Sequence, residues 1–146
     1  TVRNNPYKLI WNPLSGTENP GYEFTLSHTV KISEEELLKD ADQKVKNAYF
    51  LMKNPPEYEL YDLKNDPYEF ENLANNKANV TILSELKSVL WKWQKETFDP
   101  LIDKNKAAKL FDLIQEVGME HKPRILVPYA TFTNPKLEFN NKPLKQ

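Results

Sequence analysis

Cysteine is absent from this sequence of 146 residues, and only three glycines occur in it. The lack of Cys excludes disulfides, thiolate metal sites and a cysteine nucleophile within the chain. The scarcity of Gly leaves little room for a glycine-rich loop that cradles nucleotide phosphates. No apolar run approaches the roughly 20 residues that a bilayer-spanning helix needs. Thiol chemistry, a nucleotide cradle and a bilayer-spanning helix therefore have no support in this sequence.

Charge of one sign is also lacking, since 20 basic residues face 21 acidic ones. This balance gives no field that would favour nucleic acid or an anionic membrane as partner. Aromatic residues at 12% and charged residues at 28% are typical of a globular chain. The sequence has no initiator Met and no signal peptide before its first expected strand, so we expect it to begin inside a longer protein.

Alternating apolar residues predict several strands. Residues 7–11 place Tyr7, Leu9 and Trp11 on one face, and the turn-like residues before them predict a hairpin with residues 2–3. Residues 58–63 predict a second long strand. Weaker alternation suggests short strands over 22–26 and 125–127. We expect a small antiparallel sheet of about four strands.

Three amphipathic helices are predicted to pack against this sheet, which makes the fold class α+β. Ser33 and Glu36 form a capping box, and the apolar period after them extends the first helix to about residue 53. Residues 81–97 predict the second helix, whose apolar stripe includes Trp93, with Trp91 and Phe98 extending its buried area. Residues 107–117 predict the third, ended by Gly at position 118.

Residues 55–74 carry the most information. Two prolines precede the strand over 58–63, residues 64–67 have turn chemistry, and Pro67 can open a short helical turn. The pattern ELYDL–x–x–DP–x–E–x–x–NLA in this stretch resembles a signature near the C-terminal end of sulfatases. The residues of this chain that fill it include Glu59, Leu60, Tyr61, Asp62, Asp66, Pro67, Asn72 and Leu73.

A second stretch, from Trp93 to Asp99 and Pro100, reads W–Q–x–E–T–x–D–P and resembles the corresponding helix end of heparan N-sulfatases. The strand that carries Arg3 and Lys8 also resembles the start of the sulfatase C-terminal region. The resemblance covers residues 1–100, taken as a C-terminal α+β domain. Residues 101–146 form an extension that we expect to pack on the same domain.

The resemblance implies that catalysis belongs to a larger N-terminal domain, in which a formylglycine and a Ca²⁺ ion act on the sulfate group. We expect no catalytic residue, metal ligand or cofactor in this chain, because the formylglycine motif and its metal ligands are missing from it. Arg3, Lys8 and His28 are the candidate substrate-binding residues. The alternative for Arg3 and Lys8 is that they are solvated residues on a strand face. The alternative for His28 is a structural or surface role.

The expected function is that of a non-catalytic domain that packs on the catalytic domain and helps to shape its substrate pocket. A sulfated glycan, N-sulfoglucosamine of heparan type, is the expected substrate, and a homodimer could form. The resemblance implies an extracytoplasmic location, and the many Lys and Asn residues favour a bacterial periplasm over a lysosome. The alternatives are a different sulfatase and a self-standing carbohydrate-binding or interaction module that uses Trp11, Trp91 or Tyr61.

Overall fold

The computed structural model describes residues 1–117 of the chain, and the α+β class is confirmed in them. The chain divides into two compact units, Thr1–Lys92 and Trp93–Gln146, with the boundary inside a long helix. The first unit holds the sheet, and a set of helices over residues 20–53 is inserted between its second and third strands. We call residues 20–53 the helical insert.

The sheet contains three antiparallel strands in the order β1 (Val2–Arg3), β2 (Tyr7–Trp11) and β3 (Tyr58–Asp62). Leu9 lies opposite both Val2 and Leu60, and Trp11 lies opposite Tyr58. The predicted hairpin and both long strands are therefore confirmed. The described residues contain three strands where about four were expected, and the candidate strand over 125–127 lies outside them.

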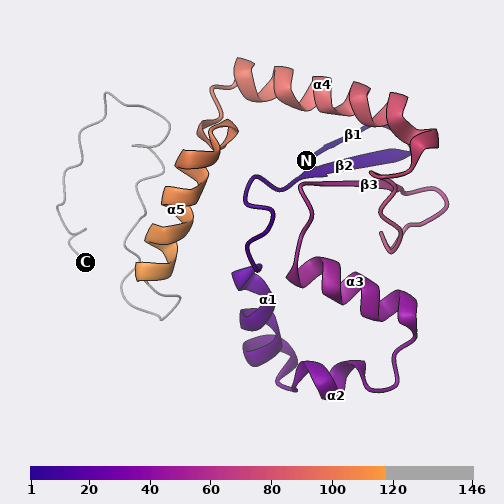
Figure 1. The fold of residues 1–146 in the computed structure, drawn as a ribbon, viewed down its shortest axis with the longest axis vertical. Coiled ribbons are helices and arrows are strands. Elements are labelled where there is room, and N and C mark those ends of the chain that lie inside the picture. The colour runs from indigo at the N-terminus through magenta and orange to yellow at the C-terminus, as the bar shows by residue number, and fades with distance from the viewer. Residues whose placement is uncertain (118–146) are drawn as a thin grey trace, which may run out of the picture. The chain divides into compact units, whose positions relative to one another are not determined.

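The core lies on the face of the sheet that carries Leu9, Trp11 and Leu60. These side chains pack with Leu86 and Leu90 of α4 (Val80–Glu96). In Figure 1 α4 runs along one side of the strands, and the helical insert lies on the other side of them. Leu9 and Leu60 are fully buried, and burying a leucine contributes roughly 1.5–3 kcal/mol.

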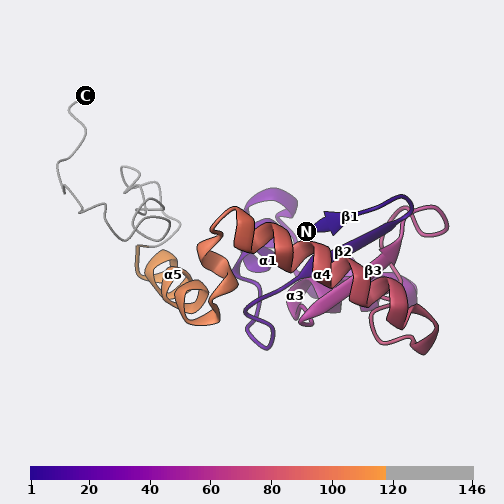
Figure 2. The same ribbon diagram turned by 90° about the horizontal axis from the view of Figure 1, so that it is seen from above.

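Helix α4 has the predicted amphipathic stripe as far as Leu90, but the expectation that Trp93 belongs to the buried stripe is wrong, because Trp93 is 55% exposed. Ile82 and Leu83 are partly buried beside Leu86 and Leu90. Trp91 packs against Trp11 with ring centroids 5.9 Å apart, although it keeps 38% of its surface exposed. The crossing of α4 over the strands is visible from above in Figure 2. This helix therefore closes one face of the sheet, as expected.

The short strand expected over 22–26 is wrong, because the structure places these residues in helix. α1 (Pro20–Phe24) continues into the π-helix η1 (Thr25–Val30). Tyr22 and Leu26 are both buried, and a spacing of four residues is a helical period. Asn19 caps α1 by accepting a hydrogen bond from the amide of Gly21 at 3.0 Å.

The single helix expected to run to residue 53 is broken into α2 (Glu34–Leu38) and α3 (Gln43–Lys53). The capping interaction of Ser33 with the Glu36 amide is present at 3.1 Å. Asp42 is a second N-cap, which accepts from the Val45 amide at 2.9 Å. An aspartate cap can start a new helix inside a continuous apolar period, and this local signal outweighed the period.

Lys53, the last residue of α3, joins the parts of the helical insert. Its Nζ lies 3.1 Å from Glu34 and 3.6 Å from Glu18, and it sits 5.5 Å from the centroid of the Tyr22 ring. The hydrogen bond to Glu34 is the main cause that raises the pKa of Lys53. The insert is thus held by both polar and aromatic contacts, since the buried Tyr22 also packs edge-on against Tyr49 of α3 with ring centroids 6.4 Å apart.

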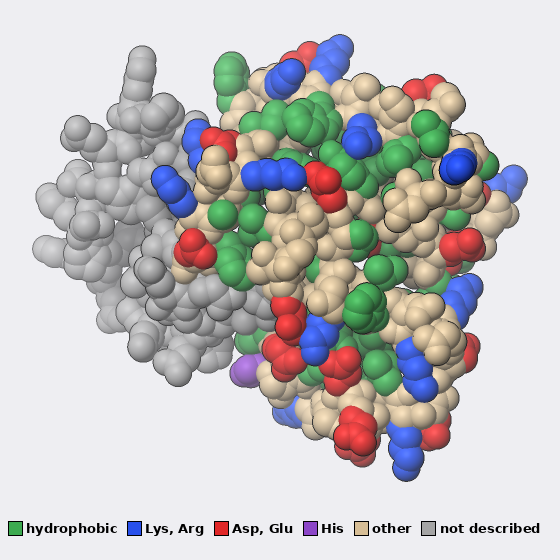
Figure 3. Space-filling view, viewed as in Figure 1, with side chains coloured by type: hydrophobic (Ala, Val, Ile, Leu, Met, Phe, Trp, Pro, Cys, Tyr) green, Lys and Arg blue, Asp and Glu red, His purple; other side chains and the backbone are tan. Residues whose placement is uncertain are grey.

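The second unit begins with the last turn of α4 and continues through the 3₁₀ helix η3 (Pro100–Ile102) into α5 (Lys104–Val117). The predicted third helix is therefore present and starts three residues earlier, where Asp103 accepts from the Asn105 amide at 2.9 Å. The expected helix end at position 118 and the domain boundary at residue 100 remain predictions. On the face drawn in Figure 3, positive and negative side chains are interspersed over the described residues.

Candidate functional site

The second face of the paired strands β2 and β3 carries polar side chains. Lys8 lies opposite Tyr61, and Ile10 lies opposite Glu59. Because successive side chains of a strand point to opposite faces, these residues point away from Leu9 and Leu60. Asn12 follows β2 directly, next to Glu59 across the strands. We call Lys8, Asn12, Glu59, Tyr61 and Glu69 the hairpin network.

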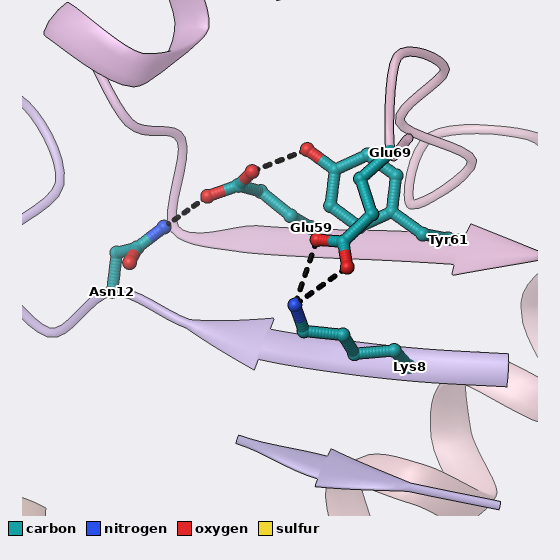
Figure 4. A network of polar contacts seen from close by, with 5 residues as sticks. All are labelled: Lys8, Asn12, Glu59, Tyr61 and Glu69. Carbon is teal, nitrogen blue, oxygen red and sulfur yellow. Dashed lines mark hydrogen bonds and ion pairs between the residues drawn. The ribbon is translucent and has the colours of Figure 1, made fainter. Parts of the chain in front are cut away.

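Figure 4 shows how the five side chains of the hairpin network meet. Both carboxylate oxygens of Glu69 accept hydrogen bonds from Lys8 Nζ at 2.7 Å. Glu59 accepts from Asn12 Nδ2 at 2.7 Å with one oxygen and from the Tyr61 hydroxyl with the other. Asn12 Nδ2 also donates to the carbonyl of Pro56 at 2.7 Å.

Burial decides what this network can do. Tyr61 is 4% exposed, and this burial, followed by its hydrogen bond to Glu59, raises the pKa of the tyrosine well above its usual value. Lys8 and Glu69 keep about a quarter of their side-chain surface exposed, at 25% and 30%. The hydroxyl of Tyr61 therefore stays protonated at neutral pH and acts as a donor to Glu59. The network ties β2, β3 and the loop after β3 together.

The loop after β3 does not form the short helical turn expected at Pro67. It runs through a series of turns to residue 76. Glu69 has a φ of 59°, a left-handed conformation that interrupts a helix. This conformation coincides with the placement of its carboxylate on Lys8, 61 residues earlier in the chain. A long-range ion pair thus accompanies the departure from the local helical pattern.

The polar residues of the ELYDL–DP–NLA stretch hold that loop by their side chains. Asp62 accepts from the Lys64 amide at 3.1 Å and from Asn65 Nδ2 at 2.7 Å, and the bond from Asn65 is the main cause that lowers the pKa of Asp62. Asp66 accepts from the Glu71 amide at 2.7 Å. The turn predicted over residues 64–67 is therefore confirmed.

Asn72 binds the outer edge of β3. Its Oδ1 accepts from the amides of Leu60 at 3.0 Å and Ala74 at 2.9 Å, and its Nδ2 donates to the Tyr58 carbonyl at 3.2 Å. The Leu73 amide adds a bond to the Leu60 carbonyl at 2.8 Å. Backbone groups of an edge strand need partners or water, and this loop supplies them as a further strand would.

The second stretch with sulfatase resemblance, Trp93–Pro100, ends α4. The Asp99 amide bonds to the Gln94 carbonyl at 2.9 Å, and the Phe98 amide bonds to the Lys95 carbonyl at 3.3 Å. Asp99 then caps η3 by accepting from the Leu101 amide at 2.9 Å. Phe98 is 83% exposed, so the expectation that it extends the buried area is wrong in this unit.

Of the three candidate substrate-binding residues, the structure brings two together. Arg3 and Lys8 are cross-strand partners, whereas His28 lies in η1, where its ring stacks on Phe24 with centroids 4.3 Å apart. Lys8 is already neutralised by Glu69, while the exposed Arg3 has no ion pair with any described residue. Their roles as ligands remain predictions.

Asn12 and Glu69 belong to the network but were not among the candidate residues. Glu69 stands in the signature pattern, so its position was visible in the sequence while its partner was not. The hydrogen bond between Asn12 and Glu59 joins residues 47 positions apart. Only the strand register could have predicted it.

The metal and the formylglycine implied by the resemblance find no matching residues here. Within residues 1–117, no group of three or more His, Cys, Asp or Glu side chains could hold a metal ion. The sequence contains no Cys. No helix within the described residues has the length and apolar character needed to cross a membrane.

Comparison with known proteins gives two significant similarities. The chain is 44% identical over 45 residues to N-sulphoglucosamine sulphohydrolase from Homo sapiens, which is 31% of this chain and 9% of that protein. It is 45% identical over 49 residues to an ulvan-active sulfatase from Formosa agariphila, which is 34% of this chain and 10% of that protein. The chain contains a sulfatase-related region.

The sulfatase-related region covers about a third of the chain, while the matches span only about a tenth of the length of either relative. No family model matches the chain. No solved structure matches it at a significant level. The two relatives differ in the substrates that their names state, so their shared feature is sulfatase chemistry in general.

Proposed function

We propose that this chain is the C-terminal domain of a sulfatase-type hydrolase. The observation that carries the proposal is the pair of sulfatase relatives at 44% and 45% identity. The α+β fold supports it, because the polar residues of the ELYDL–DP–NLA stretch each have a structural task in the hairpin and its loop. The domain would pack on the catalytic domain and help to shape the substrate pocket.

In this proposal catalysis takes place in another domain of the same protein. The formylglycine and Ca²⁺ would belong there, since this chain has no Cys and its described residues hold no cluster of metal ligands. The hairpin network would contribute rigidity, because its acidic and basic groups already bind one another. Arg3 would be the cation free to meet a sulfate.

The proposed substrate is an N-sulfated glucosamine of a heparan-type glycan. Support comes from the W–Q–x–E–T–x–D–P stretch over 93–100 and from the name of one relative. The ulvan-active relative has the same level of identity, so another sulfated glycan is the alternative within the same chemistry. We also propose an extracytoplasmic location, with a bacterial periplasm preferred to a lysosome, and the domain could support a homodimer.

A self-standing carbohydrate-binding module is the alternative from a different class. Sugar platforms need exposed aromatic faces. Trp11 is 9% exposed and Tyr61 is 4% exposed, and Trp91, at 38%, uses part of its surface to pack on Trp11. The three aromatic residues considered for this role are therefore used mainly inside the domain, which favours the first proposal.

The test is to express the intact gene product and to measure sulfate release from an N-sulfated glucosamine and from sulfated ulvan oligosaccharides. We expect release from the first substrate by the intact product and none by residues 1–146 alone. Release from ulvan only would replace the proposed substrate by the alternative. Tight binding of either glycan by residues 1–146, without release by the intact product, would support the binding module and contradict the proposal.

A further inference from the structure

The strongest unexplained feature of the chain is the conformation of Phe98. Its φ is 54°, and its side chain is 83% exposed. The left-handed region is unfavourable for an ordinary L-residue, and bulky residues are rare there. Helices commonly end with such a residue, but Gly or Asn usually occupies the position. A large apolar side chain here has no evident benefit within its own unit.

Within residues 1–117, two other non-glycine residues share this backbone conformation, and both are polar. Glu69, with a φ of 59°, binds Lys8 with both carboxylate oxygens. Lys31, with a φ of 61°, ends η1 and is exposed. Phe98 is thus the apolar member of the three. Backbone strain of this kind persists where the surrounding structure and a function require it.

Phe98 is held in a defined position by the backbone around it. Hydrogen bonds from the amides of Phe98 and Asp99 close the end of α4, and Asp99 caps the next helix. Gln94 is 3% exposed, and its Nε2 lies 3.3 Å from Asp99. The Thr97 hydroxyl donates to the Trp93 carbonyl at 2.8 Å. A backbone that is already fixed at Phe98 reduces the entropy lost when the side chain binds a partner.

Trp93, on the last turn of α4, is the second exposed aromatic residue of this segment, with 55% of its surface exposed. Trp and Phe are enriched in the cores of protein interfaces, where a few such side chains carry most of the binding energy. Lys95 stands between them in sequence and is exposed. This combination of exposed aromatics and nearby charge is typical of a buried contact with a polar rim.

We propose that Trp93 and Phe98 form a docking surface for the part of the same polypeptide that lies outside these 146 residues. The length of the relatives points to another domain as the occupant of this surface, because each relative is about ten times longer than the region that it shares with this chain. This inference rests on the proposed function, which requires a separate catalytic domain. It adds the side chains that the catalytic domain covers.

The test is whether the substitution Phe98→Asn raises or lowers the thermal midpoint of the intact gene product. Asn tolerates the left-handed region, so Phe98→Asn relieves backbone strain and should raise the thermal midpoint if Phe98 stays in water. If Phe98 is covered by another domain, the same substitution loses buried apolar contact. We expect the midpoint to fall by about 2–4 °C, as a small loss of stability in a large domain would cause.

Lys31→Asn is the matched control, because it relieves the same left-handed backbone strain at an exposed polar residue that ends a helix. We expect it to leave the midpoint unchanged or to raise it. A rise with Phe98→Asn equal to that with Lys31→Asn would overturn the docking surface. Trp93→Ser, measured as a separate variant of the intact product, should lower the thermal midpoint as Phe98→Asn does.

Two other occupants are distinguished by the same variants. If the Phe98→Asn effect changes sign when residues 118–146 are deleted from the intact product, those residues cover Phe98 and the proposal is wrong. If the effect disappears on dilution as a dimer dissociates, a second copy is the occupant and the proposal is also wrong. The midpoints do not depend on sulfate release, so a protein without the proposed activity can still support the docking surface.

Discussion

The two stretches that resemble sulfatases use their side chains in opposite ways. Between Glu59 and Ala74, polar side chains bind the backbone and one another, and Leu60 and Tyr61 are buried while Tyr68 is exposed. Between Trp93 and Pro100, polar residues close and cap helices, while the aromatic side chains of Trp93 and Phe98 are exposed. The first stretch therefore defines the hairpin, and the second presents a surface.

The largest loss of stability is expected from a substitution in the core of the first stretch. Leu60→Ala removes a fully buried side chain that packs on Leu9 and α4, and we expect a loss of about 3 kcal/mol in the free energy of unfolding. Urea denaturation of residues 1–146 measures it. Met52→Ala is the control on α3, where the side chain is 44% exposed, and it should cost less than about 1 kcal/mol. Equal losses would contradict the assigned core.

Asn72→Ala comes next in size. The substitution removes three hydrogen bonds at the edge of β3, and we expect a loss of about 2 kcal/mol. Asn47→Ala removes one exposed bond to Gln43 within α3 and should change stability by no more than about 0.5 kcal/mol. If both asparagines behave alike in urea denaturation, the signature loop does not stabilise the sheet.

Alkaline pH should lower the free energy of unfolding through Tyr61 of the first stretch. Burial and the Glu59 hydrogen bond raise the pKa of Tyr61, so above the usual pKa of about 10 the unfolded chain releases a proton that the folded chain keeps. This contribution is complete below pH 10 and is lost as pH rises, by about 1.4 kcal/mol per pH unit for one proton. Denaturation at pH 8 to 11.5 should show this slope reduced in Tyr61→Phe. Identical slopes would mean that Tyr61 is not protected.

A smaller effect is expected at the helix end of the second stretch. Asp99→Ala removes the cap of η3 and the partner of Gln94, and we expect a loss of about 1 kcal/mol. Asp99→Asn retains a capping oxygen and should restore most of the stability. If Asp99→Ala is neutral in thermal unfolding, the exposed segment is not held as the structure shows, and the comparison of the two stretches fails.

The smallest effect belongs to the ion pair of the hairpin network. Lys8→Met removes a pair whose groups keep 25% and 30% of their surface, and exposed pairs contribute about 0.2–1 kcal/mol. The loss should shrink in 0.5 M NaCl because salt screens the pair. Lys77→Met, at an exposed position, is the control for removing a charge. A loss that is independent of salt would show that Lys8 acts through packing instead.

The elements whose signals are local can be predicted from the sequence. The alternation around Leu9 and Leu60 predicted the two long strands, and the period of α4 predicted its buried stripe. Two errors arose where one local signal competed with another. Tyr22 and Leu26 fit a weak strand as well as a helix, and the Asp42 cap interrupts an apolar period that alone predicts one long helix.

The candidate site was less predictable, because its contacts join residues distant in the chain. The Lys8–Glu69 pair spans 61 positions, and the Asn12–Glu59 bond spans 47. A residue type shows that a side chain can form an ion pair, but the register of the strands selects its partner. From the sequence, Lys8 is therefore a candidate cation for binding sulfate. In the fold, it pairs with the carboxylate of Glu69.

By itself, the sequence determined the α+β class, the hairpin, the long helix and the sulfatase resemblance, since these depend on periodicity and on fixed spacing along the chain. The tertiary structure alone decided which polar groups are satisfied and which apolar groups are left in water. Glu69 and Phe98 show the reason, because both adopt the left-handed conformation. The fold gives Glu69 a partner across the sheet and leaves Phe98 exposed.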